Sequence, residues 1–369
     1  MHNEIKRRKM REKRSIFIDF SIFIFFFIII SLLAVWTTNY NYVFNHILGI
    51  LFSIFIYYIF SKINFQYLLK FTFPLHLISM ILLALVVIPG MGITVNGAKR
   101  WLDLGLFNFQ PSGMAKLTMI LYLTSVFYQT KNRKSTKNSL YNSKKAFIIS
   151  LLTAFIILFI QRDFSTAVFI FSFYIVVYFI HNERVAKLLW GGVAMVTLVV
   201  FFVLNSNSYR FQRIKGWIEY ITGNSEPVMQ LKYSLLSLSL GGKFGVGYGA
   251  GEYKEYLPAA HTDFIFSVLG EELGFAFLLF IIGLYILFMY KIIRIIKKSS
   301  YDYELYFLFL GGYLISAQAA INMGVTVGLF PITGLTLPFI SYGRTSLLMF
   351  MALIGLMKSV EKEIVRRKF

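Results

Sequence analysis

Long apolar runs separated by short polar segments make up most of this 369-residue chain. Ten runs stand out, at residues 15–37, 43–62, 67–89, 113–128, 146–161, 164–181, 188–205, 263–290, 304–329 and 343–358. A run of about 20 apolar residues is long enough to cross a bilayer as a helix. The pattern therefore predicts an all-α integral membrane protein with about ten transmembrane helices, which form a single polytopic membrane domain over residues 1–369.

Composition supports this prediction and excludes several other classes of protein. Hydrophobic residues make up 57% of the chain and charged residues 15%, which excludes a soluble domain with one anchor. The absence of cysteine excludes disulfides and thiolate metal sites. The first apolar run follows a basic tail at 1–14 and lacks a small-residue cleavage site, so we expect a retained span and not a removed signal peptide.

The net charge of +20 is concentrated in alternate loops. With residue 1 placed in the cytoplasm, the inside segments hold 26 of the 37 lysines and arginines. This asymmetry follows the positive-inside rule, places both termini in the cytoplasm and removes the reason to expect nucleic-acid binding. The same cations favour contact with anionic membrane lipids.

Two of the predicted outside loops have the composition of folded structure. Residues 90–112 are dense in Gly, Trp, Asp and Asn, and residues 206–262 form a large extracytoplasmic loop between the seventh and eighth spans. A loop of this length is usually functional or disordered. Its short apolar runs alternate with turns, which favours short amphipathic helices on the membrane surface.

Two adjacent cations, Lys99 and Arg100, stand beside Trp101 in the first of these loops. Arginine forks phosphate oxygens, lysine supplies a compact charge, and tryptophan covers a sugar face, so the trio suits a diphosphate or sugar headgroup. The alternative is an interfacial anchor, because Trp and Lys/Arg commonly lie at the headgroup level.

Two further charges fall within or beside apolar spans. Lys116 lies inside the fourth run and Asp163 at the start of the sixth, both toward the outer side. A lone charge there is costly, so a structural ion pair between the two is the simplest prediction. Arg162 is a rival partner for the aspartate.

Asp263 is the carboxylate at the mouth of the eighth run, where the long polar loop ends. As a helix cap it would have a lowered pKa, whereas burial against the neighbouring phenylalanines would raise the pKa. Glu271 and Glu272 lie about 12–14 Å further along a helix, too far to share its proton. His261 has no partners at metal-ligand spacing, which favours a supporting role.

Residues 322–346 interrupt the last part of the ninth run. Pro331 and Pro338, with several glycines, break the helical pattern. Irregular backbone at membrane depth is tolerated where protein or a polar cavity satisfies it. The segment is therefore predicted to line a cavity that Asp263 faces, the alternative being an ordinary re-entrant turn.

Taken together, these blocks resemble the SEDS proteins of bacterial cell-wall synthesis, the group of RodA, FtsW and their sporulation relatives. The resemblance covers about 96–346 and rests on residues 96–101, 110–112, 257–258, 261–266, 270–274, 331–334, 337–339 and 341–343. Residues 101–105 and the short tails are more similar to RodA than to FtsW.

The resemblance implies a ten-span enzyme of the bacterial cytoplasmic membrane that polymerises lipid II into glycan strands on the outer face. It implies a class B penicillin-binding protein as the partner that crosslinks these strands. It also implies Asp263 as the catalytic residue and Lys116 with Asp163 as an ion pair.

Candidate roles follow from the chemistry of joining a sugar hydroxyl to a diphosphate-linked donor. Asp263 is expected to act as the base. The expected substrate-binding residues are Lys99, Arg100, Trp101, Arg210, Arg213, His261 and Ser341. The sequence calls for no cofactor, although a divalent cation held by Asp263 and the substrate diphosphate is compatible with it.

Several positions depart from the family pattern. Gly113 and Ala259 stand where the family has glutamate, and Arg162 and Arg344 stand where it has proline and glycine. Two alternatives therefore remain: a lipid flippase or transporter, which broken helices and buried charges also suit, and a non-catalytic scaffold that activates a penicillin-binding protein.

Overall fold

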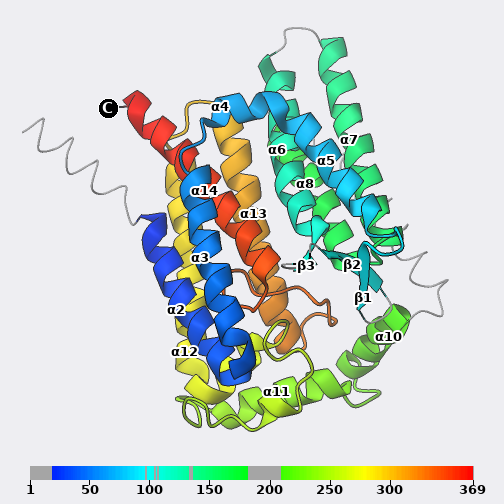
Figure 1. The fold of residues 1–369 in the computed structure, drawn as a ribbon, viewed down its shortest axis with the longest axis vertical. Helices are drawn as coiled ribbons and strands as arrows, with labels where there is room; N and C mark the ends of the chain where they lie inside the picture. Colours follow the sequence, from blue (N-terminus) through cyan, green and yellow to red (C-terminus); the bar gives the residue numbers. More distant parts are fainter. Residues whose placement is uncertain are drawn as a thin grey trace, which may run out of the picture.

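Long, roughly parallel helices form the body of the protein, as the computed structural model shows for residues 19–95, 98–103, 105, 108–132, 136–181 and 209–368 (Figure 1). The long helices are α2 (Phe20–Thr38), α3 (Val43–Phe60), α5 (Thr72–Leu85), α6 (Pro111–Asn132), α7 (Thr136–Phe159), α8 (Phe164–His181), α12 (Ile265–Ile296), α13 (Asp302–Thr326) and α14 (Arg344–Lys368). The short ones are η1 (Tyr40–Tyr42), α4 (Phe65–Leu68), η2 (Leu69–Phe71), α10 (Tyr209–Ile221), α11 (Met229–Gly241) and η3 (Tyr253–Glu255).

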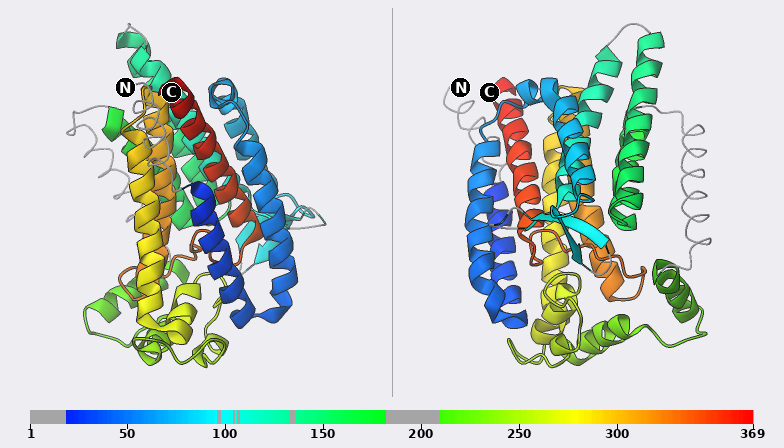
Figure 2. Two further views of the ribbon diagram at one scale, coloured as in Figure 1. Left: turned by 90° about the vertical axis from the view of Figure 1, so that its left-hand side faces the viewer. Right: turned by 45° about the vertical axis from the view of Figure 1, so that its right-hand side comes forward.

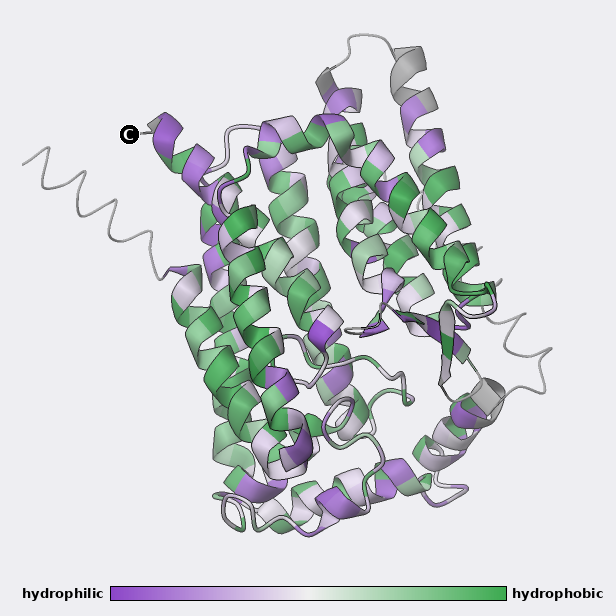
Figure 3. Cartoon of the chain, viewed as in Figure 1, coloured by the Kyte–Doolittle hydropathy of each residue, from purple (hydrophilic) through white to green (hydrophobic). Residues whose placement is uncertain are grey.

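Nine of the ten predicted apolar runs fall on these long helices, with α4 and η2 leading into the third. The run at 188–205 and the basic tail at 1–14 lie outside the described residues. Within the described ranges, seven helical segments are long and apolar enough to cross a membrane; α6 and α14 are not among them. Hydrophobic residues cover the middle of the long helices, while hydrophilic ones collect on α10, on α11 and at the C-terminal end of α14 (Figure 3). The predicted fold class, a polytopic helical membrane protein, is confirmed.

Both loops predicted to be folded contain regular structure. The first forms a small antiparallel sheet of β1 (Gly92–Val95), β2 (Ala98–Asp103) and β3 (Asn108–Phe109), an addition to the all-α prediction. The second contains α10 and α11, which lie at the end of the molecule opposite the C-terminus (Figures 1 and 2). Short helices were expected here, and the structure has them.

A sharp kink divides α12 at Gly274, where φ is 78°. The chain at Phe244–Gly245 packs so closely here that a Cβ on Gly274 would lie 2.3 Å from the Gly245 nitrogen, so only glycine fits. Just before the kink, Glu271 accepts hydrogen bonds from the backbone N–H groups of Glu252 and Tyr253, at 2.7 and 3.1 Å. The predicted continuous helix over 263–290 is therefore two helical segments, and its first segment holds the preceding loop.

The segment between α13 and α14, residues 327–343, is irregular, as its prolines and glycines predicted. Phe339 anchors it in the core between Phe27 and Phe350, with ring centroids 5.3 and 5.2 Å away. The Tyr285 hydroxyl donates a hydrogen bond to the Pro338 carbonyl. This irregular segment is thus fixed among the long helices.

Candidate active site

Asp263 lies two residues before α12 and is held by its backbone. Its N–H donates to the carbonyl of Ala259 at 3.0 Å, and its carbonyl accepts from Asn322 Nδ2 of α13 at 2.8 Å. The same Nδ2 donates to the carbonyl of Leu335 at 2.7 Å. One buried amide therefore joins the Asp263 loop to the irregular segment 327–343.

The irregular segment also lies directly against the Asp263 carboxylate. A Cβ on Gly334 would stand 3.5 Å from Asp263 Oδ2, and the φ of Gly334 is 72°. The Ser341 hydroxyl donates to the carbonyl of Thr262 at 2.5 Å and accepts from the Leu337 N–H at 2.8 Å. Both of these partners are backbone groups, so Ser341 ties the irregular segment to the Asp263 loop, and its substrate contact stays a prediction.

The structure decides between the two opposing expectations for the pKa of Asp263. The N-cap of α12 is Phe264, with no side-chain cap hydrogen bond, so the helix-cap interpretation is wrong. Burial raises the pKa of Asp263; the Thr262 hydroxyl and the cations Arg213 and Arg100 oppose this rise only in part, and the nearby Asp163 carboxylate adds to it. The side chain is thus a stronger base than an exposed aspartate.

Arg100 owes its position to an irregularity in the small sheet. Ile93 pairs with Trp101 and Thr94 with Lys99, so Arg100 is the extra, unpaired residue of a β-bulge. Bulges re-aim side chains and are frequent beside active sites. Here Arg100 Nε and Nη2 donate to the carbonyls of residues 161 and 162, at 3.1 and 2.8 Å. The bulge thus connects the sheet to the turn before α8.

The predicted Lys116–Asp163 pair is an attraction between neighbouring charges and not a hydrogen-bonded ion pair. Lys116 Nζ donates instead to Gln318 Oε1 at 3.1 Å. The Asp163 carboxylate accepts from the N–H and hydroxyl of Thr166, at 3.1 and 2.9 Å, and so caps the start of α8. Each charge is satisfied by a nearby polar group, which the sequence did not indicate.

The other predicted binding residues are distributed around this centre. Lys99 donates to the carbonyl of residue 87 at 3.3 Å, and Trp101 is half-buried on β2. Arg213 lies on α10, near enough to affect Asp263. The side chain of Arg210 lies outside the described residues.

His261 joins an aromatic cluster with Tyr42 and Tyr342. Its ring centroid lies 5.0 Å from that of Tyr42 and 5.7 Å from that of Tyr342. Its carbonyl accepts from the Tyr342 N–H at 2.9 Å, and burial lowers the pKa of its imidazole.

A line of polar residues on α13 escaped the sequence reasoning. Gln318, Asn322 and Thr326 are spaced four residues apart and are buried at 2%, 1% and 0% exposure. Gln318 Nε2 donates to the carbonyl of Thr336 at 2.9 Å, one turn from the Asn322 contacts. Their spacing of four residues places them on one face of an apolar helix, and this pattern in the sequence could have revealed them.

This arrangement can accept a proton and stabilise negative charge in the same place. A half-buried carboxylate with a raised pKa lies within electrostatic range of two arginines from different elements, Arg100 of β2 and Arg213 of α10. Among the described residues, no three acidic or histidine side chains gather in a way that could hold a metal ion by themselves. Asp263 could provide one ligand to a cation that a diphosphate also binds.

Comparison with known families gives one match over almost the whole chain. The model described as "FTSW_RODA_SPOVE: Cell cycle protein" matches residues 13–365. Among curated proteins, the "Probable peptidoglycan glycosyltransferase FtsW" of Trichlorobacter lovleyi is 36% identical, over 81% of this chain and 78% of the relative. The protein of the same description from Coxiella burnetii is 33% identical, over 88% and 87%.

Solved structures share the fold. A chain of "Structural coordination of polymerization and crosslinking by a peptidoglycan synthase complex" superposes with a TM-score of 0.78 at 24% identity, covering 93% of this chain and 97% of that one. The rod shape determining protein RodA of Thermus thermophilus gives a TM-score of 0.68 at 23% identity, covering 93% and 95%. At these identities the likeness establishes the arrangement of helices alone.

Proposed function

We propose that this chain, which belongs to the FtsW/RodA/SpoVE family of cell cycle proteins, is a peptidoglycan glycosyltransferase. Its proposed reaction is the polymerisation of lipid II. Relatives at 33–37% identity with that activity in their names support the enzyme class. The observation that carries the mechanism is the Asp263 carboxylate, whose pKa is raised by burial and which feels the charges of Arg213 and Arg100.

The reaction joins an acceptor sugar hydroxyl to the anomeric carbon of a lipid-diphosphate-linked donor. The new bond is between the acceptor oxygen and that carbon, and the bond that breaks is between that carbon and the diphosphate oxygen. Asp263 takes the hydroxyl proton as the new bond forms; a base with a raised pKa is better matched to this task near neutral pH. Arg100 and Arg213 stabilise the negative charge that develops on the departing lipid diphosphate.

The test is polymerisation of labelled lipid II by the purified protein, with glycan length read on a gel. Asp263→Asn keeps the shape of the side chain and removes the base, so we expect loss of product. Asp302→Asn, at the far end of the bundle on α13, is the matched control and keeps the activity. Full polymerisation by the Asp263 variant would refute the assignment. Translocation without product would identify a flippase. The absence of both product and translocation would identify a scaffold.

A divalent cation is the one cofactor that the site could use. When bound between Asp263 and the substrate, it would supply further neutralisation of the diphosphate. Polymerisation measured with a chelator, and then with magnesium or manganese restored, shows whether the reaction requires one.

The assembly and orientation complete the proposal. A class B penicillin-binding protein is the proposed crosslinking partner, since one structural neighbour is described as coordinating polymerization and crosslinking. Both termini are placed in the cytoplasm by the distribution of lysine and arginine, which puts Asp263 toward the outer face. Epitope accessibility at the two ends, in sealed vesicles, tests this orientation.

The cellular role has two candidates, each with an observation in its favour. Residues 101–105 favour wall elongation, whereas the FtsW names of the curated relatives favour division. Localisation of a fluorescent fusion to the side wall or to the septum distinguishes them.

A further inference from the structure

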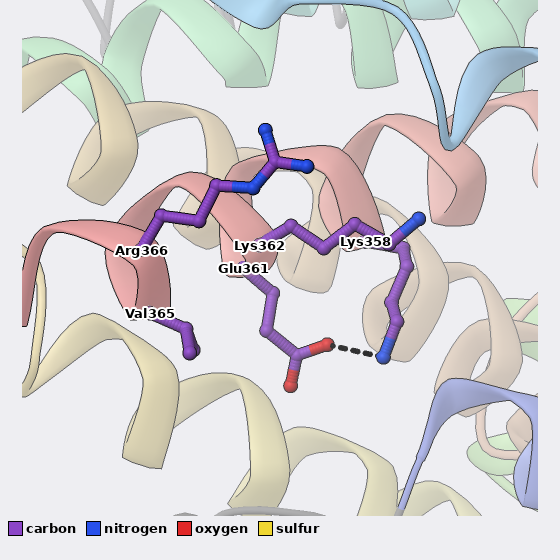
Figure 4. A pocket seen from close by; sticks show the side chains of 5 residues that line it. All are labelled: Lys358, Glu361, Lys362, Val365 and Arg366. Atoms are coloured by element: carbon purple, nitrogen blue, oxygen red, sulfur yellow. Dashed lines mark ion pairs between the residues drawn. The ribbon is translucent and has the colours of Figure 1, made fainter. Parts of the chain in front are cut away.

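The C-terminal end of α14 carries three cations on one face. Lys358, Lys362 and Arg366 are spaced four residues apart and, with Glu361 and Val365, line a hollow of about 200 Å³ (Figure 4). It lies at the end of the bundle opposite α10 and α11 (Figure 1). This end is thus distant from the Asp263 site and forms a separate polar surface.

Only the first of these cations is neutralised by carboxylates. Lys358 Nζ lies 2.8 Å from Asp19 Oδ1 and 3.1 Å from Glu361 Oε2, and Glu361 also pairs with Lys291 at 3.4 Å. Lys358 therefore belongs to a closed network in which two acids balance two cations. It contributes to the shape of the hollow more than to its net charge.

The next two cations form no ion pair with a carboxylate among the described residues, although the charge of Asp19 acts on Lys362 and that of Glu363 on Arg366. Lys362 Nζ donates to the carbonyl of Ser61 at 3.1 Å, a neutral acceptor. Arg366 has no hydrogen bond or ion pair to another described residue, and its guanidinium extends away from the Glu361–Lys358 pair (Figure 4). Burial, and then the charges of Lys358 and Arg366, lower the pKa of Lys362, and the Asp19 carboxylate opposes this only in part. The hollow therefore has an unbalanced positive potential that a bound anion would relieve.

An apolar helix surface ends beside this hollow. Ser61, which holds Lys362, directly follows α3. The last turns of α3 expose large apolar side chains on one face: Leu51, Phe55, Tyr58 and Ile59. The ligand that matches both features has a charged phosphate at one end and hydrocarbon chains at the other.

We propose that the hollow binds the phosphate headgroup of an anionic phospholipid, whose acyl chains lie along the exposed face of α3. The Arg366 fork takes two phosphate oxygens, and Lys362 supplies the second charge. Basic pockets at the ends of membrane helices bind acidic headgroups by these means. A free phosphate satisfies the cations only, and leaves the α3 face to bulk lipid.

The experiment measures how tightly the full chain in neutral detergent retains phosphatidylglycerol, by native mass spectrometry, with phosphatidylcholine and inorganic phosphate as comparison ligands. We compare the wild type with Lys362→Ala/Arg366→Ala. The control, Lys144→Ala/Lys145→Ala, removes two exposed cations from α7 and has the same net charge. A cation at a membrane surface is worth about fivefold in affinity, so we expect a roughly 25-fold loss in the first variant and little in the control.

Three outcomes overturn the proposal: equal losses in both double variants, no preference for phosphatidylglycerol over phosphatidylcholine, or full displacement of the lipid by millimolar inorganic phosphate. The melting temperature in neutral detergent without anionic lipid checks that the variants are folded. If the double alanine variant is unfolded, Lys362→Gln and Arg366→Gln singly take its place, with about fivefold expected for each. Retention by the charge-conserving Lys362→Arg supports the site.

Discussion

Replacing Asn322 by leucine is the sharpest test of how the loop of Asp263, the proposed catalytic base, is held. The amide is 1% exposed and donates to the carbonyls of Asp263 and Leu335, at 2.8 and 2.7 Å. Leucine has a similar shape and no donor. The substitution therefore removes both hydrogen bonds without opening a large cavity, and leaves the Asp263 side chain chemically unchanged.

The expected magnitude follows from the two stranded acceptors. Leaving a buried polar group without its partner costs about 1–3 kcal/mol, so two carbonyls amount to roughly 2–6 kcal/mol. If the active arrangement bears only about 2 kcal/mol of this penalty, the rate falls roughly 30-fold. A displacement of the carboxylate by about 1 Å would lower the rate about 100-fold. This corresponds to about 2.7 kcal/mol, which lies within the range of roughly 2–6 kcal/mol.

The assay is initial-rate polymerisation of labelled lipid II, with melting temperature in detergent measured on the same samples. Ser125→Ala is the control, because the Ser125 hydroxyl donates to the carbonyl of Leu69 at 3.0 Å in a buried position unconnected to Asp263. We expect both variants to lose stability and only Asn322→Leu to lose its rate. The effect should fall on kcat more than on KM, since Asn322 makes no proposed contact with substrate.

Two results would refute this reasoning. A wild-type rate in Asn322→Leu, despite a lowered melting temperature, would show that the hydrogen bonds stabilise the fold and do not position the carboxylate. An equal fall in rate for Ser125→Ala would show that activity follows stability in general.

Two further predictions concern charges. Glu272 is fully buried and its partner Lys254, at 2.8 Å, is 11% exposed, so Glu272→Gln should lower the unfolding free energy by about 3–5 kcal/mol. Glu226→Gln breaks an exposed pair at 2.7 Å and should leave the melting temperature unchanged. Equal shifts in the two variants would contradict this. Polymerisation should be lost as pH falls through the raised pKa of Asp263, because the base must be ionised. Arg213→Gln removes a cation that lowers this pKa, so it should move the acidic limb of the kcat/KM profile to higher pH. The control Lys215→Gln should not move it.

Backbone breaks and chain-scale patterns were predictable from the sequence. The apolar runs predicted the long helices, and the prolines at 331 and 338 predicted the irregular segment before α14. Each of these effects depends only on residues close together in the sequence. The Asp263 block was likewise found from its place at the end of a polar loop. These features need no knowledge of what packs against them.

Contacts between distant segments were not predictable in the same way. Arg100 became important through a bulge, which depends on the register of two strands. Lys116 donates a hydrogen bond to Gln318 on another helix, because a neutral amide oxygen can accept from a buried ammonium group just as a carboxylate can. Asn322 was one polar residue in a segment chosen for its prolines and glycines, and its partners lie 59 and 13 residues away.

Two departures from the family pattern are accommodated by packing. A Cβ on Gly113 would lie 3.2 Å from Cγ of Met349, so α14 closely approaches the backbone at Gly113. Similarly, Arg344 Cγ lies 3.0 Å from the position of a Cβ on Gly49, so its stem packs onto α3. Both positions therefore lie in close contact between helices.

Ala259 is the departure nearest to Asp263, and its geometry shows why the missing glutamate need not remove the catalytic arrangement. Its φ of 61° turns the chain so that its carbonyl accepts from the N–H groups of Thr262 and Asp263, both at 3.0 Å, and of Phe264 at 3.4 Å. Every residue has this carbonyl, whatever its side chain. The position of Asp263 thus depends on the backbone of residue 259 and on the amide of Asn322. The loop that holds Asp263 therefore forms with alanine at this position.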